Sequence, residues 1–190
     1  MARRGLDTEH VVEAAAAIAD ADGLDAVTLA RVAGGLGVRP PSLYNHVEGH
    51  SGLLRALALR GVRELTAALR DAAVGRSGTD ALTAAARAYR AYARAHPGLY
   101  AATVAAPAPG DLEHLAAAGE TVDVVFAVLR GWDLEGDDAV HAARAFRSTV
   151  HGFVVLEAAG GFGMPVDLDE SFERLVATLA GGLAGQRGST

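Results

Sequence analysis

Apolar residues recur three and four positions apart along most of the chain, which is the spacing that places them on one face of an α-helix. Alanine, a strong helix former, is abundant, and runs of β-branched residues are scarce. No segment alternates apolar and polar residues as a half-buried strand would. The pattern therefore predicts an all-α fold with about nine helices.

Three short helices are expected in the first part of the chain. Glycine ends the first two, because its backbone tolerates the left-handed conformation at a helix C-terminus. The pair Pro40-Pro41 fits only the first turn of the third helix, where the missing N–H groups would be unpaired anyway. These helices are expected between Asp7 and Gly23, between Thr28 and Gly37, and from about Arg39 to Val47.

Longer amphipathic helices are expected in the rest of the chain. Leucines at helical spacing mark the first of them, and segments rich in Gly and Pro separate the others. The predicted helices are Gly52 to Ala73, Asp80 to Ala95, Leu99 to Ala105, Asp111 to Arg130, Asp138 to Ala158 and Asp169 to Ala184.

Composition narrows the class of protein. Apolar residues make up 51% of the chain, enough for a buried core. Seventeen Arg and no Lys stand against 23 acidic residues, so the net charge is −6 and any contact with nucleic acid must be local. The absence of Cys excludes disulfides and thiolate zinc sites. Without a secretory signal or an apolar run of roughly 20 residues, we expect a cytoplasmic protein with no membrane segment.

No catalytic or metal-binding constellation is recognisable. His46 and His50 have the i, i+4 spacing of a metal-binding pair, but a break at Gly49 lies between them. The acidic segment 133–138 lacks the spacing of a calcium-binding loop, and neither a phosphate-binding loop nor a nucleophile elbow is present. We therefore expect neither an enzyme nor a bound metal or cofactor.

The second and third helices have the form of a helix-turn-helix. Both are about two turns long, and Gly37 makes the tight turn between them. Their apolar residues, at helical spacing, should bury against the first helix. The residues left facing outward are Arg39, Ser42, Tyr44, Asn45 and His46.

This part of the chain closely resembles the DNA-binding region of TetR-family transcriptional regulators. The resemblance covers residues 7 to 60 and is carried by strings that fix the turn, the core and the recognition helix together. It implies a DNA-binding domain at residues 1–48, with its third helix in the major groove, and a regulatory domain at 49–190. The matching strings are Thr28-Leu29 through Ala33, Leu36-Gly37-Val38, Ser42-Leu43-Tyr44-Asn45-His46-Val47 and Gly52-Leu53-Leu54.

The resemblance assigns DNA contacts to individual residues. Asn45 has the paired donor and acceptor that match an adenine edge, and Arg39 suits a guanine or a phosphate. Each has a plainer reading, Arg39 as a solvated charge and Asn45 as a surface residue, while Tyr44 could pack against the first helix. The DNA-binding candidates are Arg3, Arg4, Thr28, Arg39, Pro40, Ser42, Tyr44, Asn45, His46 and His50.

One position departs from the family pattern. The family usually offers a Lys to the phosphate at the start of the fourth helix, where this chain has Glu48 and His50. Glu48 would repel phosphate, so we assign the contact to protonated His50. Residues 1 to 60 hold six Arg and seven acidic residues, a net charge of −1. This balance leaves open an alternative function, a helical small-molecule or protein-binding module that has lost specific DNA binding.

A looser resemblance extends to the rest of the chain. The strings Tyr89-x-x-Tyr92-Ala93-x-x-His96-Pro97-Gly98-Leu99-Tyr100 and Val150-His151-Gly152-Phe153 are similar to the effector-binding region of the TetR subgroup named for a Trp and His-Gly motif. The Trp is absent, and Phe146 or Arg147 stands where it would fall. The resemblance implies a pocket for a small, mainly apolar effector and a dimer interface.

Two sets of residues are candidates for these roles, and each has a plainer reading as ordinary core of one chain. For the dimer set the family resemblance favours the interface. A two-fold dimer would hold its recognition helices about one DNA turn, roughly 34 to 36 Å, apart. The effector-binding candidates are His96, Tyr100, Phe126, Phe146, Arg147, His151, Phe153 and Glu157. The dimer candidates are Val150, Val154, Phe172, Leu175, Val176, Leu179 and Leu183.

The sequence thus predicts a bacterial, ligand-responsive regulator. We expect a repressor that binds a palindromic double-stranded operator as a homodimer and is released by a small effector. The helix from Gly52 to Ala73 is the expected lever between effector and DNA, because it follows directly on the helix-turn-helix.

Overall fold

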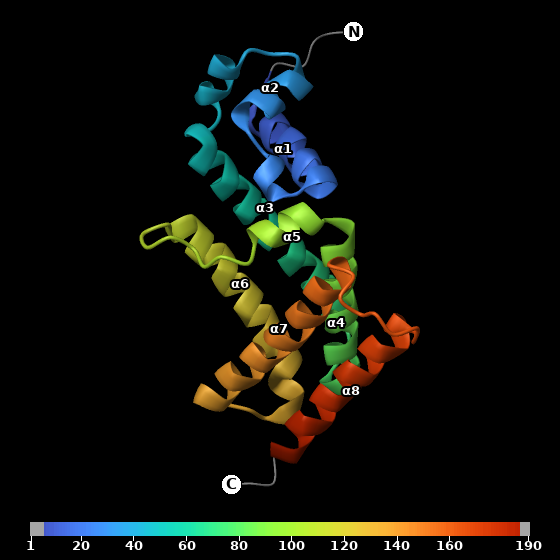
Figure 1. Ribbon diagram of the computed structural model, residues 1–190. Coiled ribbons are helices and arrows are strands. Elements are labelled where there is room, and N and C mark those ends of the chain that lie inside the picture. The colour runs from blue at the N-terminus through green and yellow to red at the C-terminus, as the bar shows by residue number, and fades with distance from the viewer. Residues whose placement is uncertain (1–5, 187–190) are drawn as a thin grey trace.

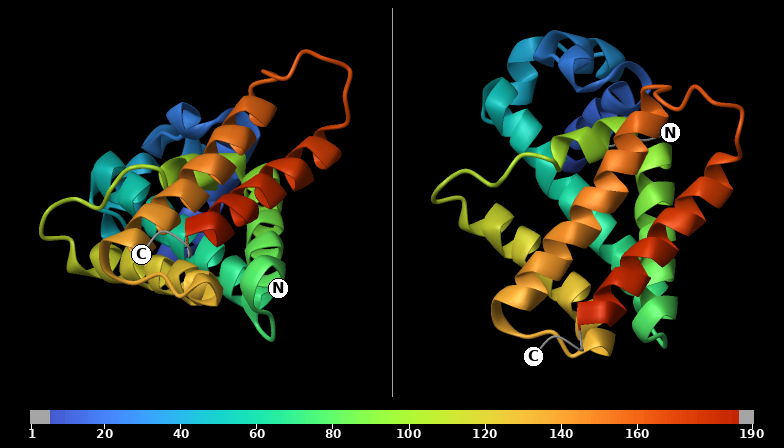
Figure 2. Two further views of the ribbon diagram at one scale, coloured as in Figure 1. Left: turned by 90° about the horizontal axis from the view of Figure 1, so that it is seen from below. Right: turned by 60° about the horizontal axis from the view of Figure 1, so that its bottom comes forward.

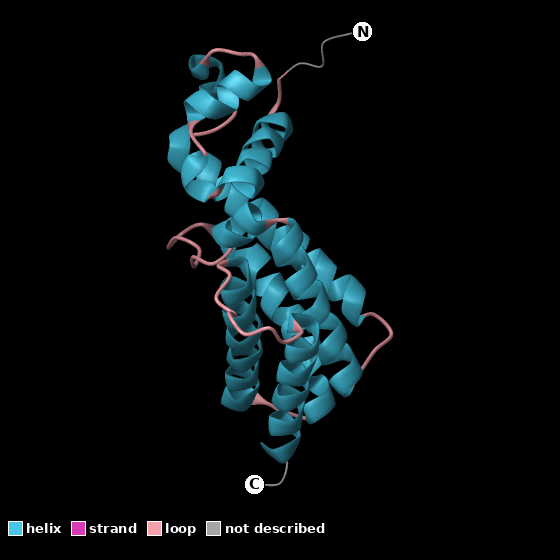
Figure 3. Cartoon of the chain, turned by 45° about the vertical axis from the view of Figure 1, so that its right-hand side comes forward, coloured by secondary structure: helices cyan, strands magenta, loops and turns pink. Residues whose placement is uncertain are grey.

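The computed structural model describes residues 6–186, and every regular element within them is helical (Figure 3). Eight α-helices and three 3-10 helices follow one another in this range. The α-helices are α1 (Thr8–Asp22), α2 (Leu29–Leu36), α3 (Gly49–Ala73), α4 (Gly78–Ala95), α5 (Pro97–Ala102), α6 (Leu112–Leu129), α7 (Gly136–Ala158) and α8 (Leu168–Gln186). The 3-10 helices are η1 (Leu24–Ala26), η2 (Pro40–Asn45) and η3 (Arg130–Trp132).

The all-α prediction is confirmed, and each predicted helical segment is helical. The largest difference lies at the third, expected as an α-helix from Arg39 to Val47 and found as the shorter 3-10 helix η2. The N–H of Ser42 donates to the carbonyl of Arg39 at 2.9 Å and that of His46 to the carbonyl of Leu43 at 2.9 Å, the three-residue span of a 3-10 helix, which is common in so short a piece. The short helices η1 and η3 were not predicted, because three-residue turns have no hydrophobic period.

The N-terminal elements α1, α2 and η2 pack against the first half of α3, at the top of the molecule in Figure 1. Their shared core includes Val11, Val32, Leu43, Leu53 and Leu57, each fully buried. The apolar stripe of each short helix turns inward because no single helix of this length is stable alone. Leu99 and Ala102 of α5 complete this core, so side chains from five helices hold the unit together.

The C-terminal part is a helical bundle in which α4 lies beside α3, α7 and α8 (Figure 2). Its core is rich in aromatic side chains, among them Tyr89, Trp132, Phe146 and Phe172. The helix α3 runs through both parts of the molecule, because Leu53 and Leu57 belong to the first core while Leu65 and Leu69 belong to the second. None of the helices in residues 6–186 has the length and hydropathy needed to cross a membrane.

Helix α5 is wedged between the two parts. A Cβ at Gly98 would lie 2.1 Å from the carbonyl carbon of Ala19 in α1, and a Cβ at Gly61 in α3 would lie 2.8 Å from the carbonyl oxygen of Leu99. Glycine at both positions lets the backbones of α1, α3 and α5 touch. A movement of α5 toward α1 or α3 therefore has to displace the helix that it meets.

Candidate nucleic-acid interface and ligand cavity

The turn between α2 and η2 has the geometry that the sequence predicted. Thr28 caps α2 by accepting a hydrogen bond from the backbone N–H of Arg31 at 3.2 Å. Gly37 adopts the left-handed conformation, with φ of 67°, and the N–H of Val38 donates to the carbonyl of Ala33 at 3.0 Å. These contacts set the direction in which η2 leaves α2.

One face of η2 is exposed, and its polar side chains make no hydrogen bonds or ion pairs within residues 6–186. Leu43 and Val47 point into the core, while Arg39, Tyr44 and Asn45 are exposed. Tyr44 is 62% exposed, so the reading in which it packs against the first helix is wrong. Among residues 6–186, no side-chain hydrogen bond or ion pair engages Arg39, Tyr44 or Asn45, so their polar groups are available to a partner.

The remaining DNA-binding candidates are placed as follows. Pro40 is exposed beside Arg39, and Ser42 and His46 are half-buried. Arg3 and Arg4 lie outside the described residues.

His50 lies beside the protein backbone. Its Nε2 is 2.8 Å from the carbonyl oxygen of Val27, so the ring joins the start of α3 to the linker before α2. Glu48 is exposed at the N-terminus of α3 and makes no side-chain capping bond there. In the described part of the chain, no three side chains of the types that bind metals come together.

A cavity of about 400 Å³ lies in the C-terminal bundle among α3, α4, α6 and α7, a size typical of small-molecule sites. Most of its lining is aliphatic or aromatic, and the polar side chains in it are few. The lining residues are Val62, Leu65, Leu69, Tyr89, Thr103, Ala118, Thr121, Val122, Val125, Phe126, Val140, Ala143, Arg144, Phe146 and Arg147.

Three of the predicted effector-binding residues, Phe126, Phe146 and Arg147, line this cavity. Two more, Tyr100 and His151, stand behind it. The hydroxyl of Tyr100 is 3.3 Å from that of Tyr89, which does line the cavity, and 2.5 Å from Nδ1 of His151. Burial raises the pKa of Tyr100 above its usual range, so this hydroxyl stays protonated.

The other three predicted effector residues, His96, Phe153 and Glu157, are not in the lining. Nδ1 of His96 is 3.0 Å from Oδ2 of Asp20 in α1, at the junction with α5. Phe153 stacks on other aromatic rings of the bundle core. A bulky or polar side chain does not by itself indicate a residue of the cavity lining, because such side chains also occur in the core of the bundle.

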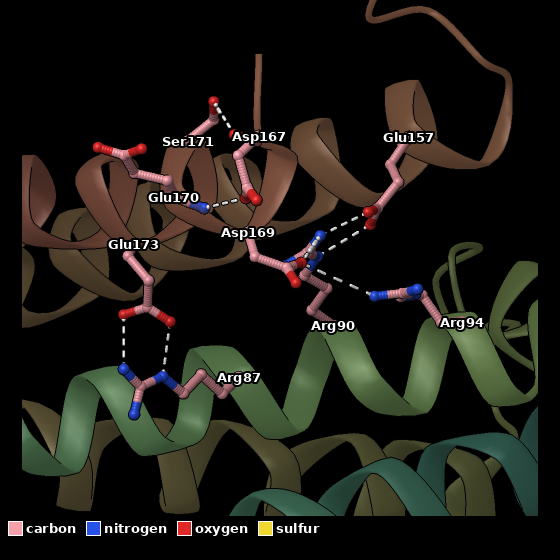
Figure 4. Close-up of polar contacts among 9 residues, drawn as sticks. All are labelled: Arg87, Arg90, Arg94, Glu157, Asp167, Asp169, Glu170, Ser171 and Glu173. Atoms are coloured by element: carbon pink, nitrogen blue, oxygen red, sulfur yellow. Dashed lines mark hydrogen bonds and ion pairs between the residues drawn. The ribbon is translucent and has the colours of Figure 1, made fainter. Parts of the chain in front are cut away.

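Glu157 belongs to an ion-pair network that joins α4, α7 and α8 (Figure 4). The guanidinium of Arg90 donates to Glu157 at 2.5 and 2.9 Å and lies 2.8 Å from Asp169. It also lies over the rings of Phe153 and Phe172, at 5.2 and 4.8 Å from their centroids. Arg90 holds the pKa of Glu157 below its usual range. The network fastens three helices of the bundle.

Sequence reasoning missed Arg144, Tyr89 and Thr121, which all line the cavity. A signal for Arg144 was present, because it lies three positions before Arg147, and residues three apart share one face of a helix. The face of α7 toward the cavity carries Val140, Arg144 and Arg147, at positions i, i+4 and i+7.

The prediction that seven residues of α7 and α8 form the dimer interface is wrong. We expected them to expose an apolar surface, but five of the seven are buried inside a single chain and the other two pack against the same core. Their stripes on α7 and α8 face each other and α4, so the bundle itself covers them. The buried residues are Val150, Val154, Phe172, Val176 and Leu183, and the partly buried ones are Leu175 and Leu179.

Comparison with known proteins identifies the family. A family model described as the C-terminal domain of tetracyclin repressor-like proteins matches residues 82–179. That description does not name the Trp and His-Gly subgroup, which stays a prediction. The HTH-type transcriptional regulator Rv0681 of Mycobacterium tuberculosis is 39% identical over 179 residues, which are 94% of this chain and 82% of that protein.

Solved structures share the fold. A protein of unknown function from Rhodococcus sp. RHA1 is 28% identical, with a TM-score of 0.80 over 96% of this chain and 97% of that one. A TetR variant from Acinetobacter baumannii AYE, solved in complex with minocycline, is 23% identical, with a TM-score of 0.75 over 96% of this chain and 99% of that one. From the matching C-terminal family model and the relative 39% identical across nearly its whole length, the chain belongs to the TetR family of helix-turn-helix transcriptional regulators, which are not enzymes.

Proposed function

We propose that the protein is a cytoplasmic repressor that binds a palindromic operator as a homodimer and is released by a small, mainly apolar effector. The observation that carries this proposal is the cavity of about 400 Å³, because one of its walls is the helix that also supports the helix-turn-helix. The Acinetobacter protein with the same fold binds minocycline, which supports a ligand site in this architecture.

The exposed face of η2 is the proposed DNA-reading surface. Asn45 offers an amide to an adenine edge, and Arg39 offers a guanidinium to a guanine or a phosphate. Residues 1–48 form the DNA-binding domain in this proposal. Because residues 1 to 60 carry a net charge of −1, sequence-independent attraction to DNA is weak.

Two helices connect the cavity to this surface. In α3, Leu53 and Leu57 pack in the DNA-binding core, and Val62 and Leu65 line the cavity two turns later. Helix α5 touches α1 at one end and contributes Tyr100, which bonds to a residue of the cavity wall. An effector that prefers the arrangement unable to bind DNA by 1 to 3 kcal/mol lowers operator affinity about 5- to 150-fold.

The dimer interface is now proposed on a different surface. Large apolar side chains are exposed where α7 ends and α8 begins, and an exposed apolar patch is typical of an association site. Val155 and Leu156 are 45% and 49% exposed, and Met164 and Val166 in the connecting loop are 80% and 62% exposed. A two-fold axis through this patch would pair α7 and α8 of the two chains.

Selection of bound sequences from a random duplex pool tests the DNA-binding part. The wild-type protein should enrich a palindrome with half-sites about one helical turn apart, and Asn45→Ala should lose the preference at one base position. Asp123→Asn, an exposed change on α6 that breaks no ion pair in residues 6–186, is the control and should enrich the same palindrome.

If the protein is a folded dimer and enriches no sequence, the proposal that it is a repressor is wrong. The exposed Glu48 at the start of α3 favours a second candidate in that event, a ligand-binding module without specific DNA recognition. That candidate predicts ligand binding with no retention of any duplex.

A further inference from the structure

Two arginines at the cavity stand out by their lack of an acidic partner. Residues 49–186 contain twelve Arg, and nine of them lie within 4.0 Å of a carboxylate oxygen. The other three are Arg130, Arg144 and Arg147, and two of these line the cavity. The sole polar contact of Arg147 in this range is with the carbonyl oxygen of Val104 at 3.4 Å.

The spacing of the two arginines is unfavourable for their charges. Arg144 and Arg147 are three residues apart on α7, so their like charges lie on one face and repel each other. Elsewhere the chain places an acid four positions away from an arginine, as in the pairs Arg60 with Glu64 and Arg174 with Glu170. An anion between Arg144 and Arg147 would replace the repulsion by two charge-assisted hydrogen bonds.

The other polar side chains of the cavity are already satisfied within the protein. The hydroxyl of Tyr89 is 3.3 Å from that of Tyr100, and Thr103 donates to the carbonyl of Tyr100 at 2.8 Å. Thr121 lies 2.6 Å from the hydroxyl of Thr66 and donates to a backbone carbonyl of its own helix. The free donors at the cavity therefore belong to guanidinium groups, which cannot accept a hydrogen bond.

We infer that the cavity takes an apolar organic acid, ionised at neutral pH, whose acidic group lies between Arg144 and Arg147 and whose body fills the cavity. Burial of the ligand's apolar body against the apolar lining is favourable, and the exposed arginines bind the ligand's acidic group close to water. The inference rests on the proposed function and specifies its ligand. A neutral or cationic compound of the same shape leaves both guanidinium groups without an acceptor and binds more weakly.

A matched pair of fluorescent probes tests this. 1-Anilinonaphthalene-8-sulfonate carries an acidic group on the same ring system that N-phenyl-1-naphthylamine presents without a charge. The wild-type protein should bind the sulfonate at least tenfold more tightly at low salt. The double variant Arg144→Gln/Arg147→Gln should bind it about tenfold less tightly and bind the neutral amine unchanged. Arg130→Gln removes the unpaired arginine outside the cavity and should change neither affinity.

Competition by fatty acids and substitutions that fill the cavity test whether the probes bind there, and the fatty acids extend the test to carboxylic acids. Octanoate, decanoate and dodecanoate should displace the sulfonate, while the corresponding alcohols should do so at least tenfold less well. Ala143→Phe and Ala118→Phe each fill part of the cavity and should weaken both probes, with the unfolding temperature reporting that each variant is folded.

The outcomes separate the two proposals. Equal affinity of wild-type protein for the acid and the neutral amine, with no effect of the double variant, overturns the inference and leaves the cavity as a site for neutral effectors. Failure of both probes and all competitors to bind the folded wild-type protein overturns the effector cavity and the inference with it. Because no operator is used, neither result depends on DNA binding.

Discussion

Replacing Asp20 by Ala should loosen the joint between the DNA-binding part and the bundle. This side chain of α1 reaches across to α5, where its Oδ1 accepts hydrogen bonds from the backbone N–H groups of Gly98 and Leu99, both at 2.9 Å. Its Oδ2 is 3.0 Å from Nδ1 of His96. The first N–H groups of a helix have no partner within it, so Asp20 acts as the N-cap of a neighbouring helix.

The contacts of Asp20 set the size of the effect. Gly98 and Leu99 are buried, so water cannot fully replace the carboxylate that their amides lose. A hydrogen bond to a charged group contributes about 1.5 to 3 kcal/mol, and loss of a capping residue costs about 0.5 to 2 kcal/mol. We expect Asp20→Ala to lower the free energy of unfolding by about 3 kcal/mol. Asp20→Asn keeps an oxygen acceptor without the charge and should cost about 1 kcal/mol.

Urea unfolding followed by circular dichroism measures this loss. With a denaturant slope of about 2 kcal/mol per molar, the midpoint of Asp20→Ala should fall by roughly 1.5 M. Amide hydrogen exchange of Gly98 and Leu99 gives a local readout and should accelerate in this variant. Asp71→Ala is the control, because Asp71 is an exposed aspartate within α3 that makes no ion pair in residues 6–186.

An unchanged stability of Asp20→Ala would refute this account of the contact between α1 and α5. Were Asp20→Ala to unfold within about 0.5 kcal/mol of Asp71→Ala, with the exchange of both amides unchanged, the carboxylate would not fasten α5 to α1. The two helices would then be held by their apolar contacts alone. Coupling between cavity and DNA-binding surface would in that case run through α3.

Three further predictions concern stability. Gly98→Ala places a methyl group against a backbone carbonyl of α1 and should cost at least about 2 kcal/mol by thermal unfolding, whereas Gly119→Ala, with open space around it, should stabilise by about 0.5 kcal/mol; equal melting temperatures would contradict the tight packing of α5. Thr28→Ala removes the N-cap of α2 and should cost about 1 kcal/mol, with Thr28→Ser as the control that keeps a hydroxyl. Glu157→Gln breaks the pair with buried Arg90 and should cost about 3 kcal/mol at neutral pH. Because the pKa of Glu157 is lowered in the folded protein, its contribution is full above its unfolded value of about 4.3 and is lost as the pH falls through the folded pKa. The difference in stability between wild type and Glu157→Gln should therefore shrink as the pH is lowered below about 4.3, and a constant difference would exclude the ion pair as its source.

Local signals in the sequence predicted much of the N-terminal part. Asp7 and Thr28, the expected limits of the first two helices, cap α1 and α2, and Gly37 takes the left-handed conformation at the turn. Leu43 is buried and Asn45 is exposed, as the helical period requires. These features depend on residues within a few positions of one another, so a single sequence carries them.

The ligand cavity was predicted less well for a physical reason. An apolar stripe indicates that one face of a helix is buried, but it does not indicate which other helix covers that face. Val150 and Phe172 are therefore equally compatible with a dimer interface and with the core in which the structure places them. His96 and Phe146 lie in similar strings, yet one contacts α1 and the other lines the cavity.

The sequence by itself determined the helical period, the caps, the turn of the helix-turn-helix and the residues that it exposes. The tertiary structure alone decided which stripes cover one another, that Arg144 and Arg147 reach the cavity without an acid, and that Asp20 caps α5 from a distance of 78 residues along the chain. Propensity, capping and turns act over one helical turn, whereas packing and charge pairing join residues that only the folded chain brings together.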